Sequence, residues 1–185
     1  MISSLRLRLA DEADLPAIGS LMTASIRGLQ APFLSAEQIE ASFSVMGLDT
    51  QLVADRTYFA VVSADGRLAG CGGWSRRATL FGGDHSAARD PALLDPAAEP
   101  ARVRAMYTHP DFARQGVGRM ILAACESACA AEGFRGCELA ATLAGEPLYL
   151  ACGYHEVERF WAPTPAGIEV PLVRMRKSLR QGDNG

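Results

Sequence analysis

Apolar and polar residues alternate along this chain with two different periods. Between residues 5 and 9 leucines alternate with arginines, which is the period of a half-buried strand. From Asp11 to Ile26 the apolar residues recur at intervals of three and four, which is the spacing of an amphipathic helix. The same periods predict helices over 36–46, 117–131 and 146–152, and strands over 57–62, 68–75, 102–108, 136–142, 154–161 and 168–177.

Local signals refine these boundaries. Ser35 with Gln38 three residues later is a capping box, which favours a helix start at residue 36. The turn sequence at 64–67 predicts a hairpin between the strands over 57–62 and 68–75. The segment 78–100 contains Gly82-Gly83 and three prolines and has no clean period. We interpret it as a long surface insertion within the domain, and residues 179–185 as a tail.

The order of predicted elements is strand, two helices, three strands, helix, strand, helix and two strands. A single mixed sheet flanked by helices buries all of these apolar faces economically, so we expect an α/β (α+β) fold. A chain of 185 residues is long enough for one domain with a sizeable core, and we assign residues 1–185 to that domain.

Composition and charge exclude several classes of function. A formal net charge of −3 gives no basic face for nucleic acid, and we interpret the basic run from Arg174 to Arg180 as a solvated strand edge and tail. No apolar stretch reaches the roughly 18 residues that a membrane-spanning helix needs, and the N-terminus has no signal-peptide pattern. The five cysteines include no Cys-x-x-Cys, and the three histidines are scattered. We therefore expect free thiols, no metal site and a cytoplasmic location.

The connection between the strand over 102–108 and the helix over 117–131 has the features of a phosphate-binding turn. Gly116 and Gly118 let the chain approach a ligand closely, and the first turn of a helix offers unpaired N–H groups to an anion. Arg114 and Arg119 flank the turn and can bind phosphate oxygens. A tight strand-to-helix turn packed on the sheet is the alternative. The residues match neither a P-loop nor a dinucleotide-binding fingerprint, because position 121 is Ile and no Gly-Lys-Ser/Thr is present.

The segment Ala113-Arg114-Gln115-Gly116-Val117-Gly118 resembles the acetyl-CoA motif of the GNAT superfamily of N-acetyltransferases, Arg/Gln-x-x-Gly-x-Gly/Ala. Ala113 departs from it, because the family has Arg or Gln there. The segment 147–154, Pro-Leu-Tyr-Leu-Ala-Cys-Gly-Tyr, resembles the family's aromatic helix that ends in Gly-Phe/Tyr. The order of elements also matches along almost the whole chain, apart from the 78–100 insertion. The resemblance implies the GNAT acyl-CoA transferase fold, with a largely antiparallel central sheet.

The resemblance also implies an activity and a set of site residues. Acetyl passes from acetyl-CoA, the co-substrate, directly to an amine in a ternary complex, and the matching proton donor to the departing thiolate is Tyr149. Cys152 nearby fits a small buried thiol better than a nucleophile. Glu138 and His109 are both candidates for the general base, although a charge on the solvent face of a strand is the commoner explanation for Glu138. The expected cofactor-binding residues are Met106, Tyr107, Thr108, Arg114, Gln115, Gly116, Val117, Gly118 and Arg119.

The sequence alone determines neither the residues of the acceptor pocket nor the identity of the acceptor. Family geometry implies a pocket built from 28–34, 74–77 and 161–167, with Phe33, Trp74 and Trp161 as its aromatic lining and with Arg76 and Arg77 suited to a carboxylate. We expect a small-molecule amine as the acceptor. The alternatives are a protein lysine or N-terminus, and a non-catalytic acyl-CoA sensor. A homodimer is compatible with the resemblance, since dimers are frequent among similar proteins.

Overall fold

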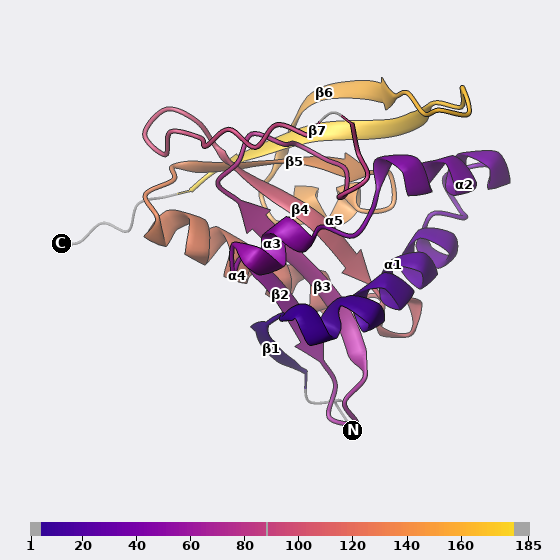
Figure 1. Cartoon of the computed structure of the whole chain (residues 1–185), viewed down its shortest axis with the longest axis horizontal. Coiled ribbons are helices and arrows are strands. Elements are labelled where there is room, and N and C mark those ends of the chain that lie inside the picture. Colours follow the sequence, from indigo (N-terminus) through magenta and orange to yellow (C-terminus); the bar gives the residue numbers. More distant parts are fainter. Residues whose placement is uncertain (1–4, 88, 180–185) are drawn as a thin grey trace.

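In the computed structural model, which describes residues 5–87 and 89–179, seven strands form one sheet in the order β1-β2-β3-β4-β5-β7-β6 (Figure 1). The strands are β1 (Arg6–Leu9), β2 (Tyr58–Val62), β3 (Leu68–Ser75), β4 (Ala101–Thr108), β5 (Gly136–Thr142), β6 (His155–Ala162) and β7 (Val170–Ser178). Only β4 and β5 run parallel, and every other neighbouring pair is antiparallel. The expectation of a mixed, largely antiparallel sheet is therefore confirmed.

Strands β4 and β5 separate soon after they begin to pair. They are paired only at Ala101 with Cys137 and at Arg102 with Glu138. By contrast, β5 pairs with β7 along its whole length, from Gly136 to Thr142. The sheet is consequently split between β4 and β5 beyond these two pairs. The edges of β4 and β5 that face the split are left without strand partners.

Helices cover both faces of the sheet (Figure 1). They are α1 (Leu15–Leu29), α2 (Ala36–Val45), α3 (Thr50–Ala54), α4 (Val117–Ala131) and α5 (Glu146–Ala151). The larger apolar core lies on the side of α4, where Val117, Ile121 and Leu122 are buried against the sheet. A second core lies under α1 and α3, around Ile18 and Leu52. None of the helices in the described residues has the length and apolar character needed to cross a membrane.

Two differences from the predicted elements have local causes. A short 3-10 helix (Glu12–Asp14) precedes α1, because Asp11 and Asp14 form a capping box there. Helix α3 was not predicted from the sequence, since five residues are too few to show a helical period.

The interpretation of the basic run as a strand edge is wrong, because β7 lies between β5 and β6, although the side chains of Arg174 and Arg176 are 33% and 44% exposed. Arg174 and Arg176 both bind Glu138, and Lys177 Nζ lies 2.7 Å from Glu126. Arg180 and the rest of the predicted tail beyond Leu179 lie outside the described residues.

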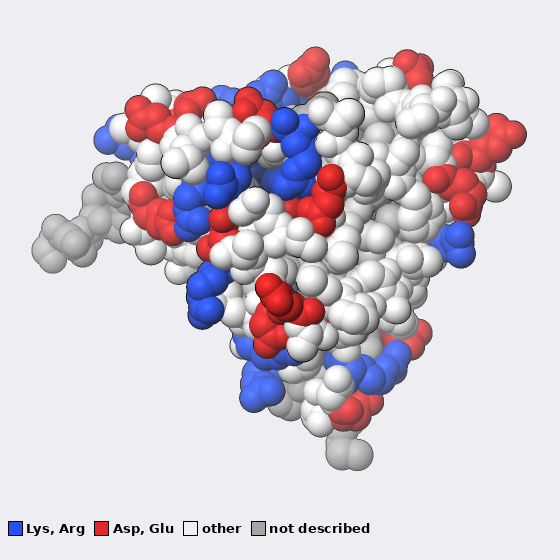
Figure 2. Space-filling view, viewed as in Figure 1, with Lys and Arg blue, Asp and Glu red and all other residues white. Residues whose placement is uncertain are grey.

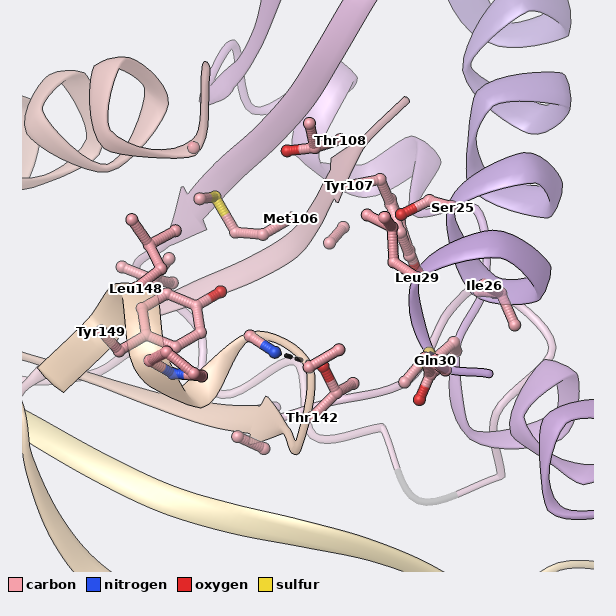
Figure 3. Close-up of a pocket in the computed structure, with 18 of the residues that line it drawn as sticks. Ser25, Ile26, Leu29, Gln30, Met106, Tyr107, Thr108, Thr142, Leu148 and Tyr149 are labelled. Carbon is pink, nitrogen blue, oxygen red and sulfur yellow. Dashed lines mark hydrogen bonds between the residues drawn. The ribbon is translucent and has the colours of Figure 1, made fainter. Parts of the chain in front are cut away.

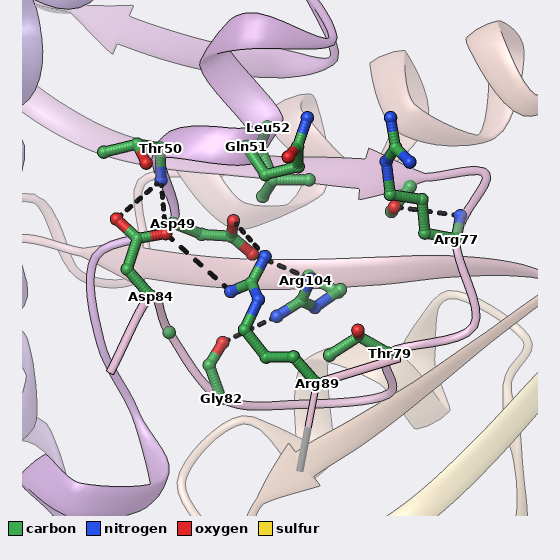
Figure 4. Close-up of polar contacts among 12 residues, drawn as sticks. Asp49, Thr50, Gln51, Leu52, Arg77, Thr79, Gly82, Asp84, Arg89 and Arg104 are labelled. Atoms are coloured by element: carbon green, nitrogen blue, oxygen red, sulfur yellow. Dashed lines mark hydrogen bonds and ion pairs between the residues drawn. The ribbon is translucent and has the colours of Figure 1, made fainter. Parts of the chain in front are cut away.

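The 78–100 insertion is attached to α3 and β4 by polar contacts (Figure 4). Asp49 is fully buried and binds two arginines, Arg104 of β4 at 2.8 Å and Arg89 of the insertion at 3.1 Å. Arg104 also donates to the carbonyl of Gly82 at 2.6 Å, and Asp84 accepts from the N–H of Thr50 at 3.1 Å. On the molecular surface, charges of both signs gather over α3 and the insertion, while the surface between them and α2 is largely uncharged (Figure 2).

Candidate active site

A pocket of about 840 Å³ opens where β4 and β5 separate (Figure 3). One end is formed by the turn before α4 and by α5. The other end is formed by α1, the end of α2 and the insertion, with Ser25, Leu29, Gln30, Met46, Leu80 and Phe81 in its wall. We call these two ends the cradle end and the acceptor compartment. The end of β4 runs between them, with Met106, Tyr107 and Thr108 in the pocket wall.

A bulge in β4 shapes the middle of the pocket. The register with β3 shifts between Cys71 and Gly73, and Ala105 has a positive φ of 52°. A left-handed conformation costs a non-glycine residue about 1–2 kcal/mol, so neighbouring contacts must hold it. The hydroxyl of Tyr58, which is buried, donates to the carbonyl of Ala105 at 3.0 Å. The bulge comprises Ala105 and Met106, so it includes the first of the three β4 residues expected to meet the cofactor.

The turn at the cradle end leaves three backbone N–H groups of the first turn of α4 without a hydrogen-bond acceptor among the described residues. Arg114 and Gly116 have positive φ values of 62° and 84°. Met120 is the first residue of α4 whose N–H bonds back to the turn, at 3.0 Å from the carbonyl of Gly116. Within the described residues, the N–H groups of Val117, Gly118 and Arg119 have no acceptor in the protein. Such a helix start attracts an anion, and the pocket wall here includes the flanking Arg114 and Arg119.

Two residues of the predicted cofactor-binding motif, Gln115 and Gly118, make contacts within the protein that the motif did not predict. Gln115 does not line the pocket, and its side chain donates to the carbonyl of Asp111 at 3.0 Å. Gly118 lies against α5, because a Cβ added there would come within 2.6 Å of Leu148 Cδ2. The small size of Gly118 thus allows α4 and α5 to pack closely, while Gly116 has open space around its Cα.

Tyr149 directs its hydroxyl into the pocket from α5 (Figure 3). The residue is only 7% exposed, and its ring packs edge-on against Tyr154 with centroids 5.8 Å apart. Burial raises the pKa of Tyr149 well above its ordinary value, so the hydroxyl keeps its proton at neutral pH. Cys152, at the end of the same helix, is half-buried rather than buried and does not line the pocket.

Neither candidate for the general base reaches the pocket. Glu138 is fully buried, so its interpretation as a solvent-facing charge is wrong. Its carboxylate binds Arg102 at 2.8 Å, Arg174 at 2.9 Å and Arg176 at 2.9 Å. Burial alone would raise the pKa of Glu138, but these three guanidinium groups outweigh burial and hold it below the ordinary value. His109 caps a short 3-10 helix (Pro110–Phe112) by accepting from the N–H of Asp111, and it is absent from the pocket wall.

The acceptor compartment differs from the one that the sequence predicts. Phe33 lines the pocket and is 49% exposed. Trp74 is instead buried against Phe134, and Trp161 is 58% exposed on β6 and outside the pocket wall.

The two arginines proposed for a carboxylate are engaged elsewhere. Arg76 binds Glu132 at 2.6 Å and Arg77 binds Asp55 at 2.9 Å, and neither lines the pocket. The wall also includes Gln30, which lies within the predicted 28–34 segment, and it is completed by two residues that the sequence analysis did not single out, Leu80 and Phe81 of the insertion. The sequence signal for the last two is an apolar pair directly before Gly82-Gly83. No cluster of three or more metal-binding side chains occurs in residues 5–87 and 89–179.

Comparisons with known proteins identify the class. A family model described as an acetyltransferase (GNAT) domain matches residues 55–156, which is more than half of the chain. A search of curated protein sequences gives no significant match. The family match shows that the chain is an acyltransferase that uses acetyl-CoA. It belongs to the GNAT family of N-acetyltransferases, as the sequence resemblance predicted.

Solved structures share the fold along almost the whole chain. A GCN5-related N-acetyltransferase from Rhodopseudomonas palustris is 22% identical with a TM-score of 0.70, and the match covers 97% of this chain and 99% of that one. PaiA N-acetyltransferase from Thermoplasma acidophilum, solved in complex with coenzyme A, is 15% identical with a TM-score of 0.63 and coverages of 95% and 99%. The ribosomal-protein-S18-alanine N-acetyltransferase from Escherichia coli is 18% identical with a TM-score of 0.58 and coverages of 98% and 99%.

Proposed function

We propose that this acetyltransferase transfers acetyl from acetyl-CoA to the amine of a small molecule, by direct attack within a ternary complex. The observation that carries the proposal is the continuity of one pocket, from the unpaired N–H groups of the cradle end, past the Tyr149 hydroxyl, to the acceptor compartment. Both substrates can thus meet without a covalent enzyme intermediate, and no cysteine lies in the pocket wall to form one.

The cradle end fits the pyrophosphate of coenzyme A. In this proposal the N–H groups of Val117, Gly118 and Arg119 bind the phosphate oxygens, and the guanidinium groups of Arg114 and Arg119 add charge-assisted hydrogen bonds. The pantetheine arm then lies in the split between β4 and β5, where it pairs with the backbone of Met106 to Thr108 as an added strand would. The thioester is thereby placed near Tyr149.

The transfer itself follows from these positions. The nitrogen of the neutral amine attacks the thioester carbonyl carbon, which forms the C–N bond, and the C–S bond then breaks. The Tyr149 hydroxyl gives its proton to the departing sulfur, so coenzyme A leaves as the thiol. The attacking nitrogen loses one proton to water, and Tyr149 recovers a proton from water before the next turnover.

The insertion favours a small acceptor over a protein segment. Leu80 and Phe81 form one wall of the acceptor compartment, and the polar contacts of Asp49, Arg89 and Arg104 hold the insertion in place. These contacts, together with the packing of Phe81 on Phe160, favour a fixed wall over an open groove at this end. A peptide chain would need an open groove at this end of the pocket.

The proposal is tested by two measurements on the same protein. Calorimetry should detect binding of acetyl-CoA, and a coenzyme A release assay against a panel of small amines, an acceptor peptide with a free N-terminus and a lysine-containing peptide should find turnover with small amines. Preference for a peptide would instead support protein acetylation. Binding without turnover of any amine would support a sensor and overturn the proposal.

A further inference from the structure

The acceptor compartment is apolar and carries few polar atoms. Leu29, Phe33 and Met46 face the insertion residues Leu80 and Phe81, and Leu172 of β7 closes the wall. The polar side chains at this end are Ser25, Gln30 and Thr142, which are neutral, and Arg104, which is positively charged and pairs with the buried Asp49 at 2.8 Å. Gln30 is only 4% exposed, and its amide donates weakly to the sulfur of Met46 at 3.6 Å.

The pocket wall also lacks a carboxylate or imidazole side chain that would pair with or deprotonate an ammonium ion. Among the described residues, its wall contains no Asp, Glu, His or Lys. The titratable groups around the compartment are held by other partners. On the α1 and α2 side, Glu40 pairs with Arg27, and His85 Nε2 contacts the carbonyl of Ser44 at 3.2 Å. Other carboxylates near the pocket are paired as well: Asp49 with Arg89 and Arg104, Asp84 with Arg89 and Thr50, Glu138 with three arginines, Glu146 with Arg159, and Asp111 with Arg67.

Charged side chains beside the acceptor compartment further disfavour the binding of an ammonium ion. Leu172 and Ala140 line the pocket, and Ala140 pairs with Arg174 across β5 and β7. Three guanidinium groups bind the carboxylate of Glu138, and one of them, that of Arg174, also pairs with Glu158 at 4.0 Å, so guanidinium groups outnumber carboxylates by one in this cluster. An ammonium ion that enters would meet this excess in addition to the cost of leaving water.

Building on the proposed function, we infer that the acceptor is an apolar amine whose amino group is substantially neutral at physiological pH, such as the α-amine of an apolar amino-acid amide or an aromatic amine. Polyamines and lysine side chains are poor acceptors. An α-amino group has a pKa of about 7.7–8.0 and a lysine ε-amine about 10.4, so at pH 7 their neutral fractions differ roughly 300-fold. With no base in the pocket wall, the protein does not compensate for this difference.

The first test uses the unaltered protein and two matched acceptors. Leucine amide presents an α-amine, and Nα-acetyl-lysine amide presents only an ε-amine; spermidine is the third acceptor. At pH 7 we expect kcat/KM for leucine amide to exceed that for the other two by about 100-fold or more, as the neutral fractions require. The logarithm of kcat/KM should rise with unit slope up to the pKa of each amine. An inflection between pH 6 and 7 that stays in place for both acceptors would reveal a protein base and overturn the inference.

The second test adds the missing charge. Gln30→Glu puts a carboxylate into the compartment wall with little change in size. Gln38→Glu adds the same charge at the half-buried start of α2 outside the pocket wall, where a Glu still completes the capping box but loses the amide's hydrogen bond to the carbonyl of Glu169. We expect Gln30→Glu to raise kcat/KM for Nα-acetyl-lysine amide relative to leucine amide by at least about 10-fold, which corresponds to one well-placed charge interaction of about 1.4 kcal/mol. Gln38→Glu should leave the ratio unchanged.

The outcomes separate this inference from the proposed function. If spermidine or the lysine derivative is the best acceptor of the unaltered protein, the inference fails and small-molecule acetylation stands. If acetyl-CoA binds by calorimetry and no amine is turned over by either protein, the proposed function fails, and the inference fails with it. An unchanged acceptor ratio in a folded Gln30→Glu protein would also overturn the inference.

Discussion

Gly118 at the start of α4 and Leu148 in α5 lie so close that a Cβ on the glycine would come within 2.6 Å of the leucine Cδ2. Leu148 lines the pocket beside Tyr149 (Figure 3). A side chain at position 118 would therefore affect the site indirectly, by displacing Leu148. It pushes on the leucine that adjoins the proposed acid.

We predict that Gly118→Val lowers acetyl-CoA affinity by at least about 10-fold, because Leu148 must move toward the pocket and a core-like contact is overpacked at a cost of about 1–3 kcal/mol. Leu148→Ala in the same chain should restore part of the affinity, since it removes the colliding atoms. Gly19→Val is the control, because Gly19 is also helical and has nothing within 4 Å of an added Cβ. Calorimetry and thermal unfolding measure all three. No rescue by Leu148→Ala would contradict this account.

Substitution of two glycines with similar backbone conformations distinguishes the effect of backbone strain on stability from an effect on acetyl-CoA binding. Gly116 in the cradle and Gly66 in the β2–β3 hairpin have nearly the same φ, 84° and 83°, and an added Cβ meets nothing within 4 Å at either position. Both Gly116→Ala and Gly66→Ala should lose about 1–2 kcal/mol of unfolding free energy. Only Gly116→Ala should weaken acetyl-CoA binding, because relaxation of its strain turns the N–H groups of the cradle. Equal affinities for the two variants would place the pyrophosphate elsewhere.

Tyr149→Phe should separate catalysis from packing. A positioned general acid contributes about 10²- to 10⁴-fold in rate, whereas one lost hydrogen bond costs about 0.5–1.5 kcal/mol of stability. We expect a large fall in kcat with acetyl-CoA affinity and melting temperature nearly unchanged. Since burial raises the pKa of Tyr149 above its ordinary 10.0, its ionisation should not reduce kcat in the unaltered protein below that pH. Tyr154→Phe is the control, because Tyr154 packs on Tyr149 without lining the pocket. A kcat for Tyr149→Phe within a few-fold of the parent would make Tyr149 a packing residue.

Glu138 should make stability sensitive to acid. The pKa of a carboxylate held by three arginines lies below its ordinary 4.5, so Glu138 stabilises the fold above that pH and loses this contribution as the pH falls through the lower, folded-state value. Glu138→Gln should be less stable at pH 7, because Arg102, Arg174 and Arg176 then lack their shared partner. It should also lose less further stability between about pH 4.5 and 2. Chemical denaturation at several pH values measures both effects, and parallel curves for the two proteins would contradict the assignment.

The sequence predicts the fold well because most elements are long enough to show their period. The helix over 117–131 and the strands of the sheet appear where the apolar spacing indicates, and the capping box at Ser35 and Gln38 forms as expected. The strand-to-helix turn with Gly116 was recognisable for the same reason, since the backbone shape it adopts depends on local residue types.

The acceptor compartment could not be predicted in this way, because its wall is assembled from segments far apart in the chain. Trp74 looked suited to a binding site by type, yet its strand position turns it into the core against Phe134. Glu138 looked like a surface charge until the sheet brought Arg102, Arg174 and Arg176 around it. Phe81 reaches the pocket because ion pairs attach the insertion to α3 and β4 and because its ring packs on Phe160 of β6. Such pairings depend on tertiary distances that periodicity does not encode.

The early separation of β4 from β5 makes the sheet two subsheets joined by a short hinge of two residue pairs. A pantetheine arm in the split would act as a strut between them, so the co-substrate becomes a mechanical part of the sheet while it is bound. At 100 times its dissociation constant such a ligand adds about 2.7 kcal/mol to the stability of the native state. Release of coenzyme A after each turnover would remove this strut, and exchange of the strand amides beside the split would follow the occupancy of the site.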